Sequence, residues 1–151
     1  EILERYLNIA FFGAGVVFAG DTLFSVGCGR MFEGTPPVML ASLDRLSALP
    51  AETLLCCGHE YTMANCAFAL SVDAGNVDLQ QRAEQARAMR ARGEPTVPVA
   101  LELEHATNPF LRVDAPAIIE TCTKALGAAA QDRVARFAWL RREKDGFRAP
   151  T

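Results

Sequence analysis

The chain contains 151 residues, half of them hydrophobic, so it can bury one core or one small sheet with an attached helical unit. Its net charge is −3, and its Lys and Arg residues are dispersed except near the C-terminus, which argues against nucleic acid as a partner. No apolar run approaches the roughly 18 residues that cross a bilayer, so we expect a soluble protein without a membrane partner.

Two short strands are the first predicted elements. The apolar runs Ile9–Phe12 and Val16–Ala19 flank a turn that contains glycine, a pattern that predicts a β-hairpin. The second strand is expected to end at Gly20, and a glycine-rich loop follows through Gly34.

A helix and another strand come next. Thr35 can cap a helix that has proline in its first turn and that ends before Pro50. The side chains expected on its buried face are Met39, Leu43, Leu46 and Leu49. The run Leu54–Cys57 predicts a short buried strand. A right-handed crossover between the two strands would bring the loops that carry Asp21 and His59 to the same sheet edge.

The rest of the chain has a helical pattern, and we place a domain boundary near Val72, between residues 1–72 and 73–151. Two helices are predicted first, one with Met63, Ala67 and Leu70 on its apolar face and one with Leu79, Ala83, Ala86 and Met89, closed by Gly93. A proline-punctuated stretch, Glu94–Pro98, leads to the segment NPFLR. Two further helices are expected near Ala115–Thr123 and Ala129–Glu143.

Two segments at strand ends carry the chemistry. GDTLF offers the carboxylate of Asp21, and CGHEY offers the imidazole of His59. Because an open α/β sheet presents reactive groups at one edge, this pair predicts metal ligands and a hydrolytic metal site. The chain holds only two His residues, whereas a catalytic metal centre usually takes several. Taken alone, an Asp after a strand is most often a turn former.

The cysteines favour a less reactive interpretation. The five Cys residues form no regular disulfide pattern, and the first residues, EILERYLN, lack a basic leader, so we expect a reducing, cytoplasmic location. The spacing of Cys57, His59 and Cys66 matches no zinc finger or ribbon, and small buried residues explain it better. Cys28 has no second His placed to activate it, and His105 is interpreted as structural.

The order of motifs resembles a known family. GDTLFSVGCGRMFEGTP, CGHEY, GEPTVP, NPFLR and RREKDGF follow one another as in hydroxyacylglutathione hydrolase, also called glyoxalase II, of the metallo-β-lactamase superfamily. The similarity runs from about Ile9 to Phe147. It implies an α+β fold: the C-terminal half of a metallo-β-lactamase αββα sandwich over residues 1–72, followed by a small helical domain over 73–151 that binds the glutathione thioester.

The resemblance also implies roles for single residues. Asp21 matches the aspartate that bridges two metal ions, and His59 matches the last histidine ligand. The residues that match contacts to glutathione are Arg30, Tyr61, Arg141 and Lys144. Phe32 stands where some members have tyrosine.

The positions of Arg141 and Lys144 support binding on physical grounds too. They lie three residues apart and extend the apolar stripe of Phe137 and Leu140, so they are expected to point toward the protein body. Fixed cations suit glutathione, which carries two carboxylates. The alternative is that basic side chains gather at a helix C-terminus to complement its dipole, and Arg142 and Arg148 are assigned that role.

The implied reaction is hydrolysis of S-lactoylglutathione to a hydroxy acid and glutathione, with two divalent metal ions as cofactors, zinc first and iron or manganese as alternatives. The family's HxHxDH segment, which supplies four ligands, does not occur in this sequence. We therefore expect the chain alone to hold no dinuclear centre. Two other hypotheses stay open: a non-catalytic chain that binds glutathione conjugates, and another superfamily enzyme such as a persulfide dioxygenase with a single iron.

Overall fold

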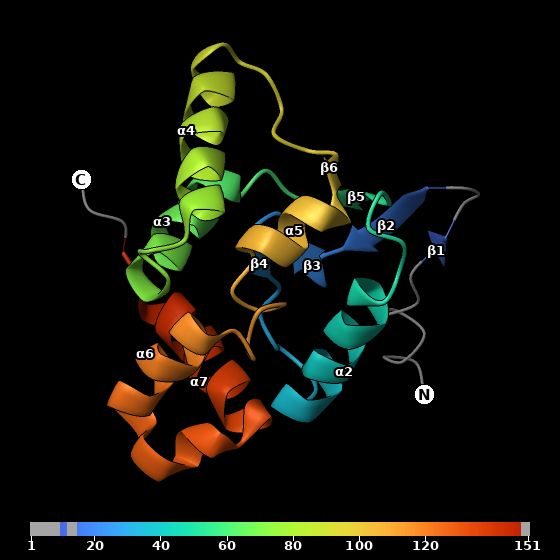
Figure 1. Cartoon of the computed structure of the whole chain (residues 1–151). Helices are drawn as coiled ribbons and strands as arrows, with labels where there is room; N and C mark the ends of the chain where they lie inside the picture. The colour runs from blue at the N-terminus through green and yellow to red at the C-terminus, as the bar shows by residue number, and fades with distance from the viewer. Residues whose placement is uncertain (1–9, 12–14, 149–151) are drawn as a thin grey trace.

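The computed structural model describes residues 10–11 and 15–148, and these form an α+β fold (Figure 1). The main sheet has the strand order β1-β2-β5-β6. Strand β1 (Ala10–Phe11) pairs antiparallel with β2 (Val16–Gly20), which confirms the predicted pairing and the end of the second strand at Gly20. Ile9, Phe12 and most of the predicted turn lie outside the described residues. Strand β5 (Leu54–Cys57) has the predicted bounds and lies parallel to β2.

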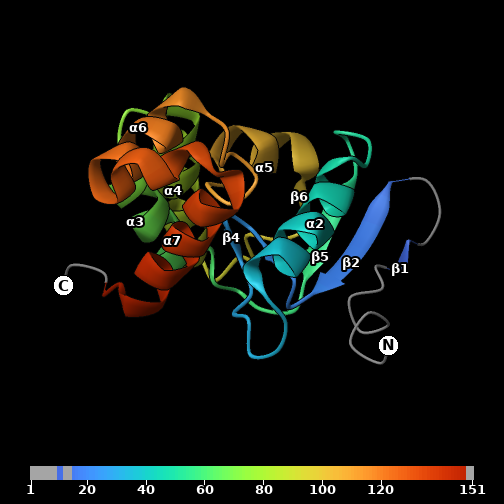
Figure 2. The same ribbon diagram turned by 90° about the horizontal axis from the view of Figure 1, so that it is seen from below.

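Helix α2 (Pro36–Ser47) forms the crossover between β2 and β5, as predicted. Thr35 occupies the N-cap position, although its side chain makes no capping hydrogen bond. The helix lies against one face of the sheet (Figure 2). Its buried residues are Met39, Leu40, Leu43 and Leu46, and Leu49 packs against the core just beyond the helix. The strand–helix–strand unit was therefore predictable from hydrophobic spacing.

The glycine-rich loop after Gly20 contains a small hairpin that the sequence did not predict. Strand β3 (Leu23–Phe24) pairs antiparallel with β4 (Gly27–Cys28) in a separate two-stranded sheet. In the register, Phe24 lies opposite Gly27, so the turn consists of Ser25 and Val26 alone. All residues from Thr22 to Gly29 are buried, and Figure 1 shows the hairpin beneath α5 at the centre of the molecule.

Two helices, a short strand and a third helix come directly after β5. Helices α3 (Thr62–Val72) and α4 (Val77–Ala91) pack on each other, and Gly93 follows α4 with φ +75°. Strand β6 (Val99–Ala100) pairs antiparallel with β5 and leads directly into α5 (Leu101–Thr107). The sequence did not predict β6 and α5, because they are short and follow a stretch punctuated by proline.

The predicted apolar face of α3 was wrong. Met63 is exposed, and Ala67 and Leu70 are half-buried. The residues that α3 buries are Thr62, Asn65, Cys66, Phe68, Ala69 and Val72. The helix contains almost no charged residue, so its composition gave little contrast between its faces, and tertiary contacts with α4 and the β3–β4 hairpin select the buried one.

The chain ends in α6 (Pro116–Leu126), a 3₁₀ turn η1 (Gly127–Gln131) and α7 (Arg133–Gly146), close to the two predicted helices. Asp132 caps α7 by accepting a hydrogen bond from the backbone N–H of Val134 at 2.9 Å. Helices α3, α4, α6 and α7 gather on one side of the β3–β4 hairpin, and the main sheet with α2 lies on the other (Figures 1 and 2).

One hydrophobic cluster connects the main sheet, α2 and the C-terminal part of the chain, and a smaller one joins α3 and α4 to the β3–β4 hairpin. The larger cluster contains Val17 and Leu55 of the main sheet, Leu43 of α2, and Phe110 and Phe137 from the C-terminal part. The domain boundary near Val72 stays a prediction, as does the αββα sandwich. Within residues 10–11 and 15–148, no helix is long and apolar enough to cross a bilayer.

Candidate functional site

The structure brings together the two side chains predicted to bind metal. Asp21 follows β2 and His59 follows β5, and since these strands are parallel neighbours, their ends meet at one edge. The Oδ1 atom of Asp21 lies 3.4 Å from the Nε2 atom of His59. Both side chains are accessible, with 67% of Asp21 and 48% of His59 exposed. A carboxylate and an imidazole therefore point to one shared, open space.

Two glycines hold the backbone around Asp21. The Gly58 N–H donates to the Gly20 carbonyl at 2.8 Å, and a Cβ atom on Gly58 would lie 2.5 Å from Asp21 Oδ1. On the other side, a Cβ atom on Gly29 would overlap the carbonyl oxygen of Asp21. The Gly29 N–H donates to the Thr22 carbonyl at 3.1 Å. Only glycine allows such close approach at both positions.

Aromatic rings surround the imidazole. The ring of Tyr61 stacks on that of His59 at a centroid distance of 4.8 Å, and it meets Phe24 edge-on at 5.2 Å. Tyr61 is half-exposed, so its hydroxyl group is available to a ligand beside the imidazole. Phe24 was not among the predicted site residues, because the sequence gives no sign that β3 turns back toward His59.

A group of cations forms next to this edge from parts of the chain that are far apart in sequence. Arg30 Nε lies 3.3 Å from Asp145 Oδ1, and Arg141 donates to the same oxygen at 2.9 Å. Lys144 belongs to the group as well, because burial and the charges of Arg141 and Arg30 lower its pKa. Arg30 follows Gly29, whose backbone lies against that of Asp21, so Arg30 connects the cation group to the loop that carries Asp21. Asp145 is the member that sequence reasoning missed.

The cations differ in accessibility. The Arg30 side chain is 61% exposed, whereas Arg141 is 4% exposed. Arg141 donates to the carbonyl of Cys28 at 2.6 Å, and its guanidinium carbon lies 5.2 Å from the centroid of the Phe110 ring. Its hydrogen bond to Cys28 thus holds β4 against α7. Lys144 is half-buried over Phe68 and donates to the Ala64 carbonyl at 3.4 Å.

The described residues contain no group of three or more His, Cys, Asp or Glu side chains placed to hold a metal ion. The zinc site considered for Cys57, His59 and Cys66 is therefore absent from them. Cys57 instead donates to the carbonyl of His59 at 3.3 Å. Within the described part of the chain, the fit of a metal rests on Asp21 and His59, whose donor atoms are of the kinds that zinc, iron and manganese accept.

The other reactive side chains have structural surroundings. All five cysteines are free. Burial raises the pKa of Cys28 to about 11, partly offset by Arg141, so the thiolate needed for nucleophilic attack is disfavoured. His105 Nε2 lies 3.1 Å from both Ser47 Oγ and the Ser47 carbonyl, in keeping with its structural interpretation.

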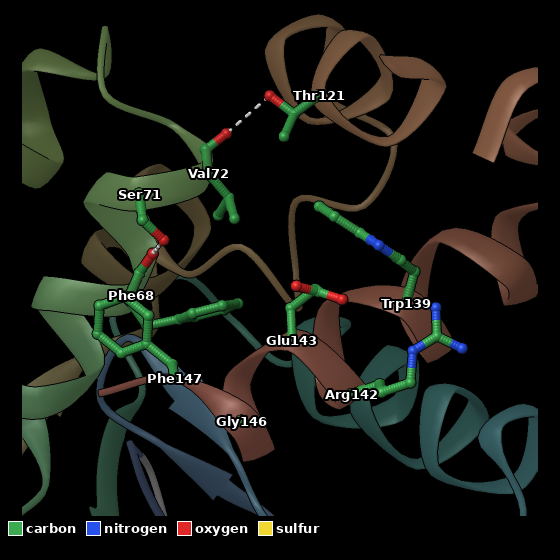
Figure 3. Close-up of a pocket in the computed structure, with 9 residues that line it drawn as sticks. All are labelled: Phe68, Ser71, Val72, Thr121, Trp139, Arg142, Glu143, Gly146 and Phe147. Atoms are coloured by element: carbon green, nitrogen blue, oxygen red, sulfur yellow. Dashed lines mark hydrogen bonds between the residues drawn. The ribbon is translucent and has the colours of Figure 1, made fainter. Parts of the chain in front are cut away.

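A separate pocket of about 400 Å³ lies between α3, α6 and α7 (Figure 3). Phe68, Trp139 and Phe147 give it aromatic walls, and Thr121 donates to the Val72 carbonyl at 3.0 Å along its side. None of the six predicted site residues lines this pocket. We therefore place the candidate site at the Asp21–His59 edge.

Comparison with known proteins decides the family. Residues 60–147 match the family model of the hydroxyacylglutathione hydrolase C-terminus. The chain belongs to the hydroxyacylglutathione hydrolase family. It is 55% identical over 142 residues to the hydroxyacylglutathione hydrolase of Xanthomonas campestris pv. campestris, and 56% identical over 142 residues to that of Xanthomonas axonopodis pv. citri. The Xylella fastidiosa hydroxyacylglutathione hydrolase is 54% identical over 144 residues.

These alignments cover 94–95% of this chain but 56% of each relative. The chain thus spans about half the length of the curated hydroxyacylglutathione hydrolases that it matches. The recognition made from the motifs is confirmed, including its restriction to the C-terminal portion of the family. The roles of the six site residues remain predictions.

Proposed function

We propose that this chain contributes the C-terminal part of a thioester hydrolase that cleaves S-lactoylglutathione and related 2-hydroxyacyl-glutathione thioesters. In this proposal, residues 1–72 form half of a metallo-β-lactamase sandwich, and the later residues bind the glutathione part of the substrate. The single observation that carries the proposal is the Asp21–His59 pair, 3.4 Å apart at the ends of parallel strands beside a group of cations. We also propose a cytoplasmic location, which the five free thiols support.

Asp21 and His59 would hold the metal. A carboxylate has a second oxygen with which to reach a neighbouring ion, which suits Asp21 to bridge two ions, and His59 offers Nε2. When bound, two divalent ions supply an activated hydroxide and polarise the thioester carbonyl. The exposure of both side chains leaves room for further ligands, which a segment with the HxHxDH motif would provide.

The cations would bind the substrate at its glutathione end. Arg30 and Lys144 offer donors to the two carboxylates of glutathione, and Tyr61 offers a hydroxyl group close to the imidazole. Arg141 is bound to protein groups, so we propose that it adds positive charge and fixes Asp145 and Cys28. Binding energy from this end would hold the thioester carbonyl at the metal edge.

The test supplies the remaining ligands. The chain is co-expressed with the part of the Xanthomonas campestris relative that lies outside the aligned residues, where we expect the HxHxDH motif of the family. We expect the complex to bind two metal ions per chain and to release thiol from S-lactoylglutathione, whereas the chain alone does neither. Asp21→Asn in the complex should abolish turnover, while Glu52→Ala, at an exposed acid away from the site, should not. Turnover by the Asp21→Asn complex would refute the proposal.

The glutathione contacts are tested through kinetics in the same complex. Arg30→Ala and Lys144→Ala should each raise KM about tenfold with little change in kcat, because the contacts are equal in ground and transition states. The effect should weaken in high salt, since both cations are partly exposed. Lys124→Ala, at an exposed cation on α6, is the matched control.

A second candidate function is binding of glutathione conjugates without hydrolysis. It is favoured by the presence of the whole cation group in a chain whose described residues offer only two adjacent metal ligands. Calorimetry of the chain alone with S-hexylglutathione, which has no thioester to cleave, separates the candidates. Tight binding together with an inactive complex would favour this second function. The match of residues 60–147 to the hydrolase family counts against a persulfide dioxygenase.

A further inference from the structure

The β3–β4 turn contains the one residue other than glycine that has a positive φ in the described part of the chain. Val26 has φ +58°, and its side chain is fully buried. A β-branched residue is disfavoured in this left-handed region, which glycine or asparagine normally fills in a tight turn. Something in the surroundings must therefore hold the Ser25–Val26 turn in place.

Glu104 of α5 provides that hold. Its Oε2 atom accepts a hydrogen bond from the backbone N–H of Val26 at 2.7 Å, and its Oε1 atom accepts from the hydroxyl group of Ser25 at 2.9 Å. The side chain is completely buried. One carboxylate thus accepts hydrogen bonds from both residues of the turn, and it lies 78 residues after Val26 in the chain.

Three more buried side chains form hydrogen bonds with the β3–β4 hairpin. Asn108 donates from Nδ2 to the carbonyls of Phe24 and Gly27 and to Glu104 Oε2. Asn65 donates to the Ser25 carbonyl at 3.0 Å. Arg82 donates to Ser25 Oγ at 3.2 Å and provides positive charge near Glu104, whose pKa is raised by burial and lowered in part by its hydrogen bonds and Arg82.

The turn is connected to Asp21 by a short and rigid path. Strand β3 begins at Leu23, two residues after Asp21. Where the hairpin leaves β4, Gly29 returns to donate to the Thr22 carbonyl and to contact the backbone of Asp21. A shift of the turn would therefore move the backbone of Asp21 and of Thr22, which follows it.

We propose that Glu104 is a positioning residue for Asp21, acting through the Ser25–Val26 turn and the β3–β4 hairpin. It does not touch the candidate metal edge itself. Its importance for hydrolysis rests on the proposed function, whereas its hold on the Asp21 loop does not.

Hydrogen exchange on the metal-free chain tests the hold directly. The probes are the hydrogen-bonded amides of Thr22, Gly29 and Gly58, which surround Asp21, and the reference is the set of amides in α2. In Glu104→Gln we expect the three probes to exchange about tenfold faster relative to the reference. Glu102→Gln, at an exposed acid of the same helix, should leave the ratio unchanged. An equal acceleration of probes and reference would show a general stabilising role and overturn the proposal, as would no acceleration.

A rescue variant tests the mechanism. Glycine adopts φ +58° without support, so the effect of Glu104→Gln on the probes should be several-fold smaller in a Val26→Gly background. If Glu104→Gln does not fold, Ser25→Ala removes one of the bonds to Glu104, and it should still accelerate the probes selectively, unlike Ser42→Ala in α2. An undiminished effect in the Val26→Gly background would overturn the role of the turn.

The co-expressed complex separates this inference from the proposed function. There Glu104→Gln should lower kcat and metal occupancy, because the loop that carries Asp21 is no longer held in place. If the wild-type complex is inactive while the exchange result holds, the proposed function fails and the positioning role stands. If the complex is active and Glu104→Gln changes neither exchange nor kcat, the positioning role fails.

Discussion

Two neighbouring regions of the molecule, the exposed Asp21–His59 edge and the buried Ser25–Val26 turn, differ in how they are held in place. At Asp21 and His59 the side chains are accessible and have few partners. At the Ser25–Val26 turn, only a few residues away, every contact is buried and four side chains from the helices converge. The comparison teaches that a reactive group can stay open to solvent when the backbone beside it is fixed from behind. Substitutions that loosen the turn should therefore lower both stability and activity, whereas substitutions at the edge should lower activity with little effect on stability.

The largest effect is expected for Asn108→Ala. The change removes the side-chain hydrogen bonds to the carbonyls of Phe24 and Gly27 and to Glu104, all in a buried region. Because each unpaired buried group costs about 1–3 kcal/mol, we expect a loss of about 4 kcal/mol in the free energy of unfolding. Denaturation by urea measures it, with the exposed Gln81→Ala as control. If Asn108→Ala lost no more free energy of unfolding than Gln81→Ala, the proposed difference between the buried turn and the exposed edge would be wrong.

The second-largest effect is expected at alkaline pH, which should destabilise the buried β3–β4 hairpin. The pKa of the Cys28 thiol is raised by burial from 9.0 to about 11, so the folded state keeps its proton where the unfolded chain loses it. The stabilising contribution is complete below pH 9 and is lost as pH rises to about 11, and it amounts to about 3 kcal/mol. Cys28→Ala should flatten this part of the stability profile. An identical slope in wild type and variant would contradict the prediction.

Gly29→Ala tests the close approach between the backbone that follows the β3–β4 hairpin and the backbone of Asp21. The added Cβ atom would overlap the carbonyl oxygen of Asp21, so backbone must move, at a cost of about 2 kcal/mol. Thermal or urea unfolding measures the loss, and turnover of the co-expressed complex should fall as well. Gly75→Ala is the matched control, since nothing lies within 4 Å of its Cβ position.

The smallest effect on stability is expected at the metal edge. Asp21→Asn should change the free energy of unfolding by less than about 0.5 kcal/mol, because the side chain is exposed and its contact with His59 is solvated. The same substitution is expected to abolish turnover in the complex. A destabilisation as large as that of Asn108→Ala would mean that the exposed pair holds the fold, contrary to the comparison.

The sheet edge with Asp21 and His59 could be predicted from sequence. The β3–β4 hairpin and the buried side chains that hold it could not. Apolar spacing and prolines gave the strand–helix–strand unit, and two strands of that unit necessarily brought Asp21 and His59 together. The β3–β4 hairpin escaped because its turn lacks the glycine or asparagine that marks such turns.

The role of the Glu104 carboxylate was not predicted, for a different reason. Glu104 lies in LELEH, where acidic and apolar residues alternate as on a solvated surface, and its burial depends on partners that are distant in sequence. Asp145 was missed likewise, because one of its cationic partners, Arg30, lies far from it along the chain. Local patterns predict elements, whereas polar contacts between distant elements require the tertiary structure.

The grip on the β3–β4 hairpin also bears on the order of folding. Its side chains come from residues 65, 82, 104 and 108, and the carbonyl of Cys28 is held by residue 141. The hairpin is therefore closed by contacts that span up to 113 residues, which makes it a late and slow step relative to the local helices. During synthesis, the loop bearing Asp21 acquires its final shape only after most of the helical part has left the ribosome.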